Sequence, residues 1–445
     1  MENIVPKHII KEYNKTRSYF WRSKICYAPF NSMRFSLSGN MYSCCYNRFQ
    51  SLGRYPEVSI RNAWNGIKAQ ELRDNITNNN FDLGCHACYT KLINNNYYSV
   101  GARIYDNYTF RKEGPSLMEF ELSNVCNLEC VMCNGENSSL IRKNREKGEP
   151  YPMVYDEAFV EQLKEFIPYL DEARFVGGEP FLSELYFKIW DEIIRINPKT
   201  KINILTNGTI LNDRILNLYK KHNIHISFSI DSIVKETYQK IRIKADYEKV
   251  MNHITLINAL SKYHHREISI NICPIRKNMF EIPEMTEYFS KMNIPVIFHT
   301  VVYPPQESLS TLTKEELKEY VSFLENSNFF KSYSQKCINY FSFKSLISLV
   351  KMWENEKTYD INDNLSFDKL WILLTKHIVD SKAAQNIDMQ DKIDDLKSIF
   401  NEISDIKIKT KAASTLLKIK AEYIIAEIQN STPEKLKNRI LVMGT

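Results

Sequence analysis

Three cysteines lie close together in the segment LSNVCNLECVMCNG, at positions Cys126, Cys130 and Cys133. This C-x3-C-x2-C spacing places three thiolates in one short loop, where each could bind a different iron of a [4Fe–4S] cluster. Protein clusters of this type are normally held by four cysteines, so a three-cysteine loop indicates an open iron that can bind a small molecule. The alternatives are a zinc site with an unseen fourth ligand and three structural cysteines.

Strand-like segments that could position this loop recur between about residues 115 and 305. They lie at 117–123, 173–178, 201–208, 224–231, 267–274 and 295–302. Helical patterns separate them; Leu211, Ile215 and Leu218 are one example. This alternation predicts parallel βα units and an α/β fold, a partial (β/α)6 TIM-like barrel with its site at the carboxyl ends of the strands.

The regions on either side of the predicted barrel have different patterns. Residues 26–114 form a small cysteine-rich module with Asn-rich turns, in which 58–76 is predicted to be one helix preceded by an extended piece. Residues 310–445 are predicted to be helical, with a capping-box pattern that begins at Thr313 and a helix start at Thr432–Pro433. The predicted division is 1–25, 26–114, 115–309 and 310–445. An aliphatic stripe of Leu417, Ala421, Ile424 and Ile428 is interpreted as core packing, with a partner-binding role as the alternative.

The loop CNLECVMC followed by GGEP resembles the radical S-adenosylmethionine enzymes over roughly residues 115–305. The resemblance implies that the three cysteines of the loop hold a [4Fe–4S] cluster whose fourth iron is chelated by S-adenosylmethionine. One electron then releases a 5′-deoxyadenosyl radical that abstracts hydrogen from a substrate. It further implies that Gly177, Gly178 and Glu179 receive the methionyl ammonium. Two glycines permit close approach of backbone and ligand, and a carboxylate accepts charge-assisted hydrogen bonds.

Polar residues at later strand ends match the places where the family contacts the remainder of S-adenosylmethionine. These residues are Thr206, Asn207, Ser229, Asp231 and Asn271. Gly208 completes the Thr-Asn-Gly turn, and Asn278 is a further candidate near the end of the fifth strand. The simpler interpretation of each is a turn or cap residue.

A second cysteine group precedes the predicted barrel. Cys26, Gly39 and Cys44 reproduce the C-x9–15-G-x4-C opening of the SPASM or twitch module, and Cys85 and Cys88 supply two more thiolates. The resemblance implies one auxiliary [4Fe–4S] cluster, in a module that usually follows the barrel but here comes first. A four-cysteine zinc site is the alternative.

Three further cysteines and one histidine are left without a ligand role. Cys45 could replace Cys44, but the spacing from the glycine favours Cys44. Cys273 and Cys337 are interpreted as spare, although Cys273 ends a predicted strand and could face a substrate. His86 lies between two predicted ligands and is interpreted as a neighbour of the site.

Composition places limits on location and partners. The chain has 445 residues, ten cysteines and a formal net charge of +6 with its basic residues dispersed. We expect a cytoplasmic protein without signal peptide or membrane span, which needs no nucleic acid. An electron donor such as flavodoxin or ferredoxin is expected as a partner.

The resemblance indicates the reaction class better than the substrate. Relatives with this auxiliary module mostly modify peptides or proteins by crosslinking, epimerisation or oxidation, so a peptide or protein side chain is the leading prediction. The alternatives are a small-molecule radical dehydrogenase or other biosynthetic enzyme, and a non-catalytic iron–sulfur or zinc scaffold. The sequence assigns no catalytic acid, base or hydrogen donor.

Overall fold

The computed structural model describes residues 3–356, 365–381 and 389–444. They form two compact units. The first comprises Met1–Ile272, Met285–Ile297 and Cys337–Ser345, and the second comprises Cys273–Glu284, Phe298–Lys336 and Leu346–Thr445. The predicted four-part division of the chain stays a prediction.

A single nine-stranded sheet runs through the first unit in the order β3-β2-β1-β4-β5-β6-β7-β8-β9. The strands are β1 (Ser32–Phe35), β2 (Asn40–Tyr42), β3 (Gly53–Arg54), β4 (Leu117–Phe120), β5 (Glu172–Phe175), β6 (Lys201–Thr206), β7 (Ile224–Ser229), β8 (Ile268–Ile272) and β9 (Val296–Phe298). Strands β1 and β4 to β8 pair in parallel, and β1 to β3 form an antiparallel ribbon. The six predicted barrel strands are β4 to β9, and the partial TIM-like barrel is confirmed.

The cysteine-rich module adds strands to this sheet, which the sequence pattern did not indicate. Strand β1 pairs in parallel with β4, with Ser32 opposite Leu117 and Phe35 opposite Phe120. The first unit therefore has one continuous sheet across the module and the barrel, rather than a separate module sheet.

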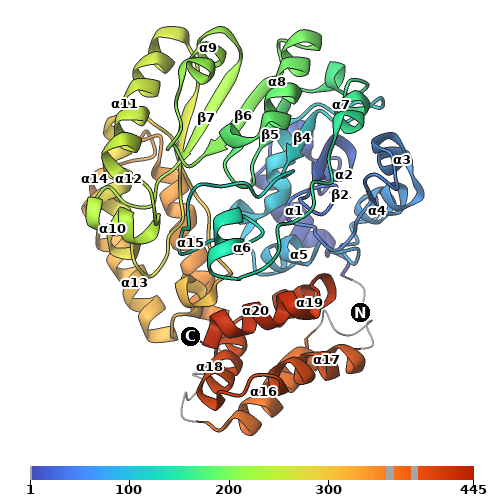
Figure 1. Ribbon diagram of the computed structural model, residues 1–445, viewed down its shortest axis with the longest axis vertical. Helices are drawn as coiled ribbons and strands as arrows, with labels where there is room; N and C mark the ends of the chain where they lie inside the picture. The colour runs from blue at the N-terminus through green and yellow to red at the C-terminus, as the bar shows by residue number, and fades with distance from the viewer. Residues whose placement is uncertain (1–2, 357–364, 382–388, 445) are drawn as a thin grey trace. The chain divides into compact units, whose positions relative to one another are not determined.

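The outward face of the sheet is apolar because alternate residues of neighbouring strands stack in register. Phe35, Phe120 and Phe175 form a column with ring centroids 5.3 and 4.8 Å apart. Trp190 of α8 (Glu184–Ile196) packs edge-on against Phe175, and Phe159 of α7 (Glu157–Leu163) against Phe35. Figure 1 shows both helices beside β4 to β6. This packing leaves the opposite face of the sheet as the interior of the barrel.

The other helices of the first unit follow the predicted alternation with local differences. They are α1 (Lys7–Lys15), α2 (Ala28–Asn31), α3 (Ile60–Asn65), α4 (Ile67–Thr77), α5 (His86–Ile93), α6 (Ser139–Asn144), α9 (Asp213–Lys221), α10 (Lys235–Ile241) and α11 (Tyr247–His264). Helices α12 (Ile282–Lys291) and α15 (Tyr340–Glu356) have residues in both units. The helix predicted over 58–76 is two helices, because the chain leaves helical geometry at Gly66 (φ −73°, ψ 171°).

The second unit is helical, as predicted. It contains α13 (Lys314–Asn326), α14 (Asn328–Ser332), α16 (Phe367–Val379), α17 (Gln390–Asn401), α18 (Ile406–Leu417), α19 (Ala421–Asn430) and α20 (Pro433–Gly444). Thr313 and Glu316 form the predicted capping box. Helices α16 to α20 surround a core that includes Leu374 and Phe400. The predicted aliphatic stripe spans two helices rather than one, because Lys420 is extended between α18 and α19.

Candidate functional site

The three-cysteine loop follows β4 and is held by backbone hydrogen bonds to a segment after α10. The N–H of Glu129 donates to the carbonyl of Ile243 at 3.1 Å, and the N–H of Val131 donates to the carbonyl of Ile241 at 2.9 Å. Ser138 also stabilises the loop, because its hydroxyl donates a hydrogen bond to the carbonyl of Leu128 at 2.7 Å. The loop is therefore positioned by two elements distant in sequence.

Cys130 is the most enclosed of the three thiols and lies beside a cation. A guanidinium N–H of Arg242 points at its Sγ at 4.0 Å, and Asp231 pairs with the same guanidinium at 2.7 Å. The hydrogen bond with Cys133 lowers the pKa of Cys130 and raises that of Cys133. Burial raises the pKa of Cys126 to about 11. Of the two hydrogen-bonded thiols, Cys130, next to Arg242, therefore loses its proton more readily than Cys133.

The sequence did not single out Arg242, which the structure places beside Asp231, one of the residues predicted to contact the cofactor. Asp231 is fully buried and ion-paired with Arg242. A buried carboxylate at a strand end requires a cation close by. The acidic residue at the end of this strand was therefore the one sequence feature that could have prompted a search for a basic partner such as Arg242.

The two glycines of the GGEP segment are required by the loop itself. Gly177 and Gly178 have φ values of +85° and +55°. A Cβ at Gly178 would lie 2.2 Å from the carbonyl oxygen of Val125, the residue before the first loop cysteine. The same carbonyl accepts the N–H of Glu179 at 2.8 Å. The glycines thus allow the segment after β5 to contact the start of the cysteine loop. This role within the protein is additional to the expected one, in which the glycine backbone approaches a ligand.

Glu179 joins the end of β5 to the end of β6. Its carboxylate accepts the hydroxyl of Thr206 and the backbone N–H of Asn207, both at 2.7 Å. The side chain is buried, and burial raises its pKa to about 7, against the lowering effect of these hydrogen bonds. A cation bound nearby would lower this pKa and favour the ionised carboxylate.

Asn207 connects this arrangement to the cysteine loop. Its Nδ2 donates to the side-chain oxygen of Asn127 at 2.9 Å and lies 3.8 Å from the Sγ of Cys126. Ser229 and Asn271 are opposite each other at the ends of β7 and β8. The structure therefore places these predicted residues at the carboxyl ends of parallel strands. Asn278 instead stabilises its own turn by accepting the N–H of Ile275.

The second cysteine group lines one small pocket in the module that precedes the barrel. Its walls are Cys26, Cys44, Cys85 and Cys88 together with Tyr46, Asn47, Phe81, Ala102 and Tyr105. Cys26 precedes α2, Cys44 follows β2, and the other two lie at the start of α5. Burial raises the pKa of each of the four thiols.

Two N–H groups of Asn47 already point at pocket sulfurs. Its backbone N–H donates to Cys44 at 3.3 Å and its side-chain N–H to Cys85 at 3.4 Å. Gly39 has φ +87° in the turn between β1 and β2, so the glycine of the motif serves the turn that delivers Cys44.

The other cysteines are not part of this pocket wall. Cys45 lies outside it and approaches the hydroxyl of Tyr105 at 3.7 Å. Cys273 and Cys337 are half-buried. His86 packs edge-on against Phe49 at 5.9 Å.

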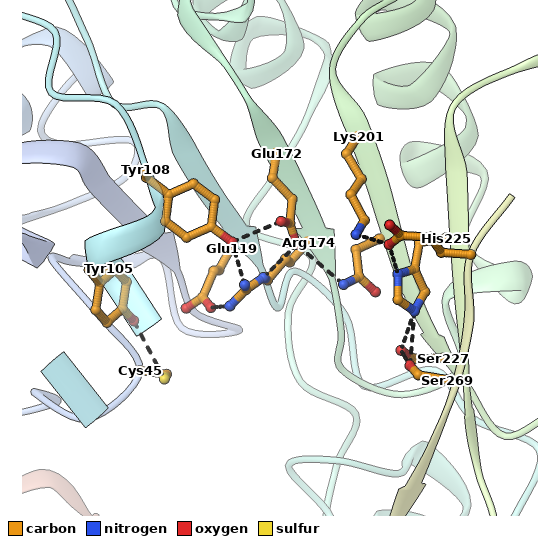
Figure 2. Close-up of polar contacts among 12 residues, drawn as sticks. Cys45, Tyr105, Tyr108, Glu119, Glu172, Arg174, Lys201, His225, Ser227 and Ser269 are labelled. Carbon is orange, nitrogen blue, oxygen red and sulfur yellow. Dashed lines mark hydrogen bonds and ion pairs between the residues drawn. The ribbon is translucent and has the colours of Figure 1, made fainter. Parts of the chain in front are cut away.

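A row of polar side chains crosses the interior face of the sheet (Figure 2). Arg34, Glu119, Arg174, Asn203 and His225 occupy matching positions on β1, β4, β5, β6 and β7. We call these five residues the interior row. It lies on the face opposite the aromatic column, inside the barrel.

Within the part of the chain that the structure describes, no three His, Cys, Asp or Glu side chains are arranged to hold a single metal ion. The pocket thiols share one cavity without meeting at one point. Among the same residues, no helix is long and apolar enough to cross a membrane.

Sequence profiles assign both cysteine groups to known families. The Radical SAM superfamily profile matches residues 120–289, and the SPASM profile, described as an iron-sulfur cluster-binding domain, matches residues 26–89. Residues 120–289 therefore match a Radical SAM domain. An iron–sulfur cluster-binding domain precedes it in the chain, as the cysteine spacing indicated.

Curated relatives match over part of their length. The chain is 25% identical over 179 residues to a probable GTP 3′,8-cyclase of Methanocella arvoryzae, covering 39% of this chain and 50% of the relative. It is 27% identical over 176 residues to the antilisterial bacteriocin subtilosin biosynthesis protein AlbA of Bacillus subtilis, covering 38% and 35%. The chain spans about half the length of the cyclases it matches, and less of AlbA.

Two solved structures resemble the chain in part. Native anSMEcpe with bound AdoMet has a TM-score of 0.37 at 20% identity, covering 49% of this chain and 59% of that one. Streptococcus suis SuiB bound to precursor peptide SuiA has a TM-score of 0.37 at 14% identity, covering 66% and 59%.

Proposed function

We propose that this protein is a radical enzyme that modifies a peptide or protein side chain, with S-adenosylmethionine bound at a [4Fe–4S] cluster on Cys126, Cys130 and Cys133. The observation that carries the proposal is the convergence at one edge of the parallel sheet: Asn207, after β6, reaches the thiol of Cys126, after β4. Ligand sites of parallel α/β sheets lie at this edge.

The donor set fits an iron–sulfur cluster. Three thiols occupy one loop, one of them beside a guanidinium that offsets the negative charge of a thiolate-bound cluster. When bound, the cluster and S-adenosylmethionine supply a 5′-deoxyadenosyl radical that abstracts hydrogen from the substrate. Cys126, Cys130 and Cys133 hold the cluster, and Arg242 stabilises anionic sulfur at Cys130.

The roles of the remaining residues follow from where they lie. Gly177 and Gly178 let the end of β5 contact the cysteine loop, and Glu179 and Asn207 present oxygen atoms and an amide at the same edge. Thr206 fixes the Glu179 carboxylate. Ser229 and Asn271, at the next two strand ends, extend this polar edge toward the rest of the cofactor. Together these groups orient S-adenosylmethionine.

We assign a second [4Fe–4S] cluster to Cys26, Cys44, Cys85 and Cys88. Four buried thiols in one pocket match the complete ligand set of such a cluster. The N–H groups of Asn47 would stabilise negative charge on two of the sulfurs. This centre would exchange electrons with the substrate or with an external donor such as a flavodoxin or ferredoxin. Four-cysteine zinc binding is the competing assignment.

A peptide substrate is favoured over a small molecule by two supports of different kinds. One curated relative is named for bacteriocin biosynthesis. In addition, the cations of the interior row are already paired with carboxylates, which suits an uncharged segment of a peptide better than the triphosphate in the name of the cyclase relatives.

The test is anaerobic reconstitution with iron, sulfide and zinc determined together. We expect about eight irons per chain from two clusters of the four-iron type, and 5′-deoxyadenosine formation on addition of S-adenosylmethionine and dithionite. Peptides encoded beside the gene would then be assayed by mass spectrometry. Iron near four with one zinc would replace the second cluster assignment, and absence of 5′-deoxyadenosine would remove the radical function.

A further inference from the structure

The interior row is crowded with charge, yet each of its cations is already paired with carboxylates. Arg174 donates through Nε to Glu172 at 2.8 Å and through Nη1 to Glu119 at 3.3 Å. Its remaining nitrogen donates to the hydroxyl of Tyr108, which in turn donates to Glu172 at 2.8 Å. All three nitrogens of this guanidinium therefore have partners from the protein (Figure 2).

Arg34, the other arginine of the interior row, is also paired with carboxylates. Arg34 pairs with Glu121 and, at 3.8 Å, with Glu119. The side chains of Arg34 and Glu119 are each 7% exposed, whereas that of Arg174 is 25% exposed. Arg174 is thus the more exposed of the two arginines in the row.

The position of Arg174 makes this pairing relevant to substrate choice. It is on β5, three residues before Gly177, and faces the interior rather than the helices. A polyanion that used Arg174 would have to displace Glu172 and Glu119 from it, and Glu119 would keep only the longer ion pair with Arg34 at 3.8 Å. Both changes oppose binding, because weakening the pairing of a buried charge is costly and like charges repel.

We propose that Arg174 is a specificity-determining residue, held by Glu119, Glu172 and Tyr108 so that the barrel accepts an uncharged peptide segment and rejects polyphosphates. The proposal rests on the proposed function for its site, and it names the substrate class that the site takes. The specificity comes from the repulsion of polyphosphates by the carboxylates around Arg174, rather than from a favourable contact with the peptide.

The test measures tripolyphosphate binding by calorimetry on reconstituted enzyme with S-adenosylmethionine present. We expect no binding to the wild type below about 1 mM, and at least about tenfold tighter binding to Glu119→Gln/Glu172→Gln, which leaves Arg174 without a carboxylate partner. Adding Arg174→Met to that variant should abolish the gain. The matched control is Glu157→Gln/Glu184→Gln, which removes the same charge beside exposed Lys188 and Arg214 and should gain nothing.

Two results would overturn the proposal: tight wild-type binding that depends on Arg174, or no gain in the variant without the two carboxylates. If that variant fails to fold by circular dichroism and iron content, Glu172→Gln alone removes the closer carboxylate, 2.8 Å from Arg174, and should give a smaller gain in the same direction. Failure of the proposed function has a different signature. It would appear as no modified peptide, while the binding pattern of the variants is unchanged.

Discussion

The four-cysteine pocket takes its thiols from three separate segments of the chain, whereas the three-cysteine loop carries all of its thiols between Cys126 and Cys133. The pocket is closed by aromatic rings and by Asn47. The loop lies at the open edge of the sheet, next to Asn207 and Arg242. Under the proposed assignment, the enclosed four-thiol set suits electron storage, and the three-thiol set at a strand edge suits binding of a reactant.

Removing the loop thiols should have the largest effect. In Cys126→Ala/Cys130→Ala/Cys133→Ala, we expect 5′-deoxyadenosine formation to fall at least about 100-fold, because metal and cofactor lose their ligands. Iron should fall from about eight to about four per chain. Chromatography of the reaction products and iron analysis measure these quantities. Cys337→Ala, a half-buried cysteine outside both groups, should match the wild type.

Removing two thiols of the four-cysteine pocket should show whether the two cysteine sites function independently. Cys85→Ala/Cys88→Ala should also leave about four irons, while substrate-free cleavage of S-adenosylmethionine stays within about threefold of wild type because the loop keeps its ligands. Cys45→Ala is the control, since this cysteine adjoins Cys44 but lies outside the pocket wall. Loss of both iron and cleavage in the pocket variant would show that the sites do not assemble independently.

Two glycine variants should each impair only one of the two sites, and by less than the cysteine variants do. Gly178 (φ +55°) supports the loop, and Gly84 (φ +78°) precedes Cys85, with an added Cβ 2.4 Å from Asn47. Each change to Ala should cost about 1–3 kcal/mol of folding free energy through backbone strain. Thermal melts measure that loss. Gly178→Ala should weaken S-adenosylmethionine binding, and Gly84→Ala should lower pocket iron; the reverse pattern would contradict the assignment.

The smallest effect is expected from a residue that belongs to neither site. Burial lowers the pKa of His225 to about 4, with Lys201 acting in the same direction and Glu267 against it. Its neutral form is therefore favoured in the folded protein. The contribution of His225 to the free energy of unfolding is fully present above its ordinary pKa of about 6.5 and is lost as the pH falls toward about 4. We expect a loss of about 1 kcal/mol between pH 7.5 and pH 5.5.

Chemical denaturation at those two pH values measures the loss in the wild type. The matched variant is His225→Gln, which keeps a polar group beside Ser269 but has no titrating proton in this range. Its stability should change less with pH by about the same 1 kcal/mol. An equal pH dependence in both proteins would assign the titration to another group.

The sequence predicted the parts of the molecule that depend on local patterns. Strands β4 to β9 were found because β-branched runs end in turn residues, and α13 because Thr313 and Glu316 form a capping box. The two cysteine groups were found because their thiols follow fixed spacings, and Cys44, which the spacing favoured over Cys45, lines the pocket.

The features that were missed depend on contacts between distant segments. Strand β1 has four residues, SMRF, and becomes a strand by pairing with β4. Arg242 lies after a helix with no motif around it, and only the folded chain brings it to Cys130. The charge pairing of Arg174 likewise involves β4, β5 and Tyr108, which no single stretch of sequence joins.

The parallel pairing of β1 with β4 also sets an order of assembly. As the chain leaves the ribosome, Ser32–Phe35 emerge long before Leu117–Phe120, so the first strand has no neighbour on that side until the barrel begins to form. Such a pairing closes a long loop and is slow compared with helix formation. Until then β1 has an unpaired edge, a surface on which chains aggregate. Expression yield should therefore be limited by the interval between synthesis of these two strands.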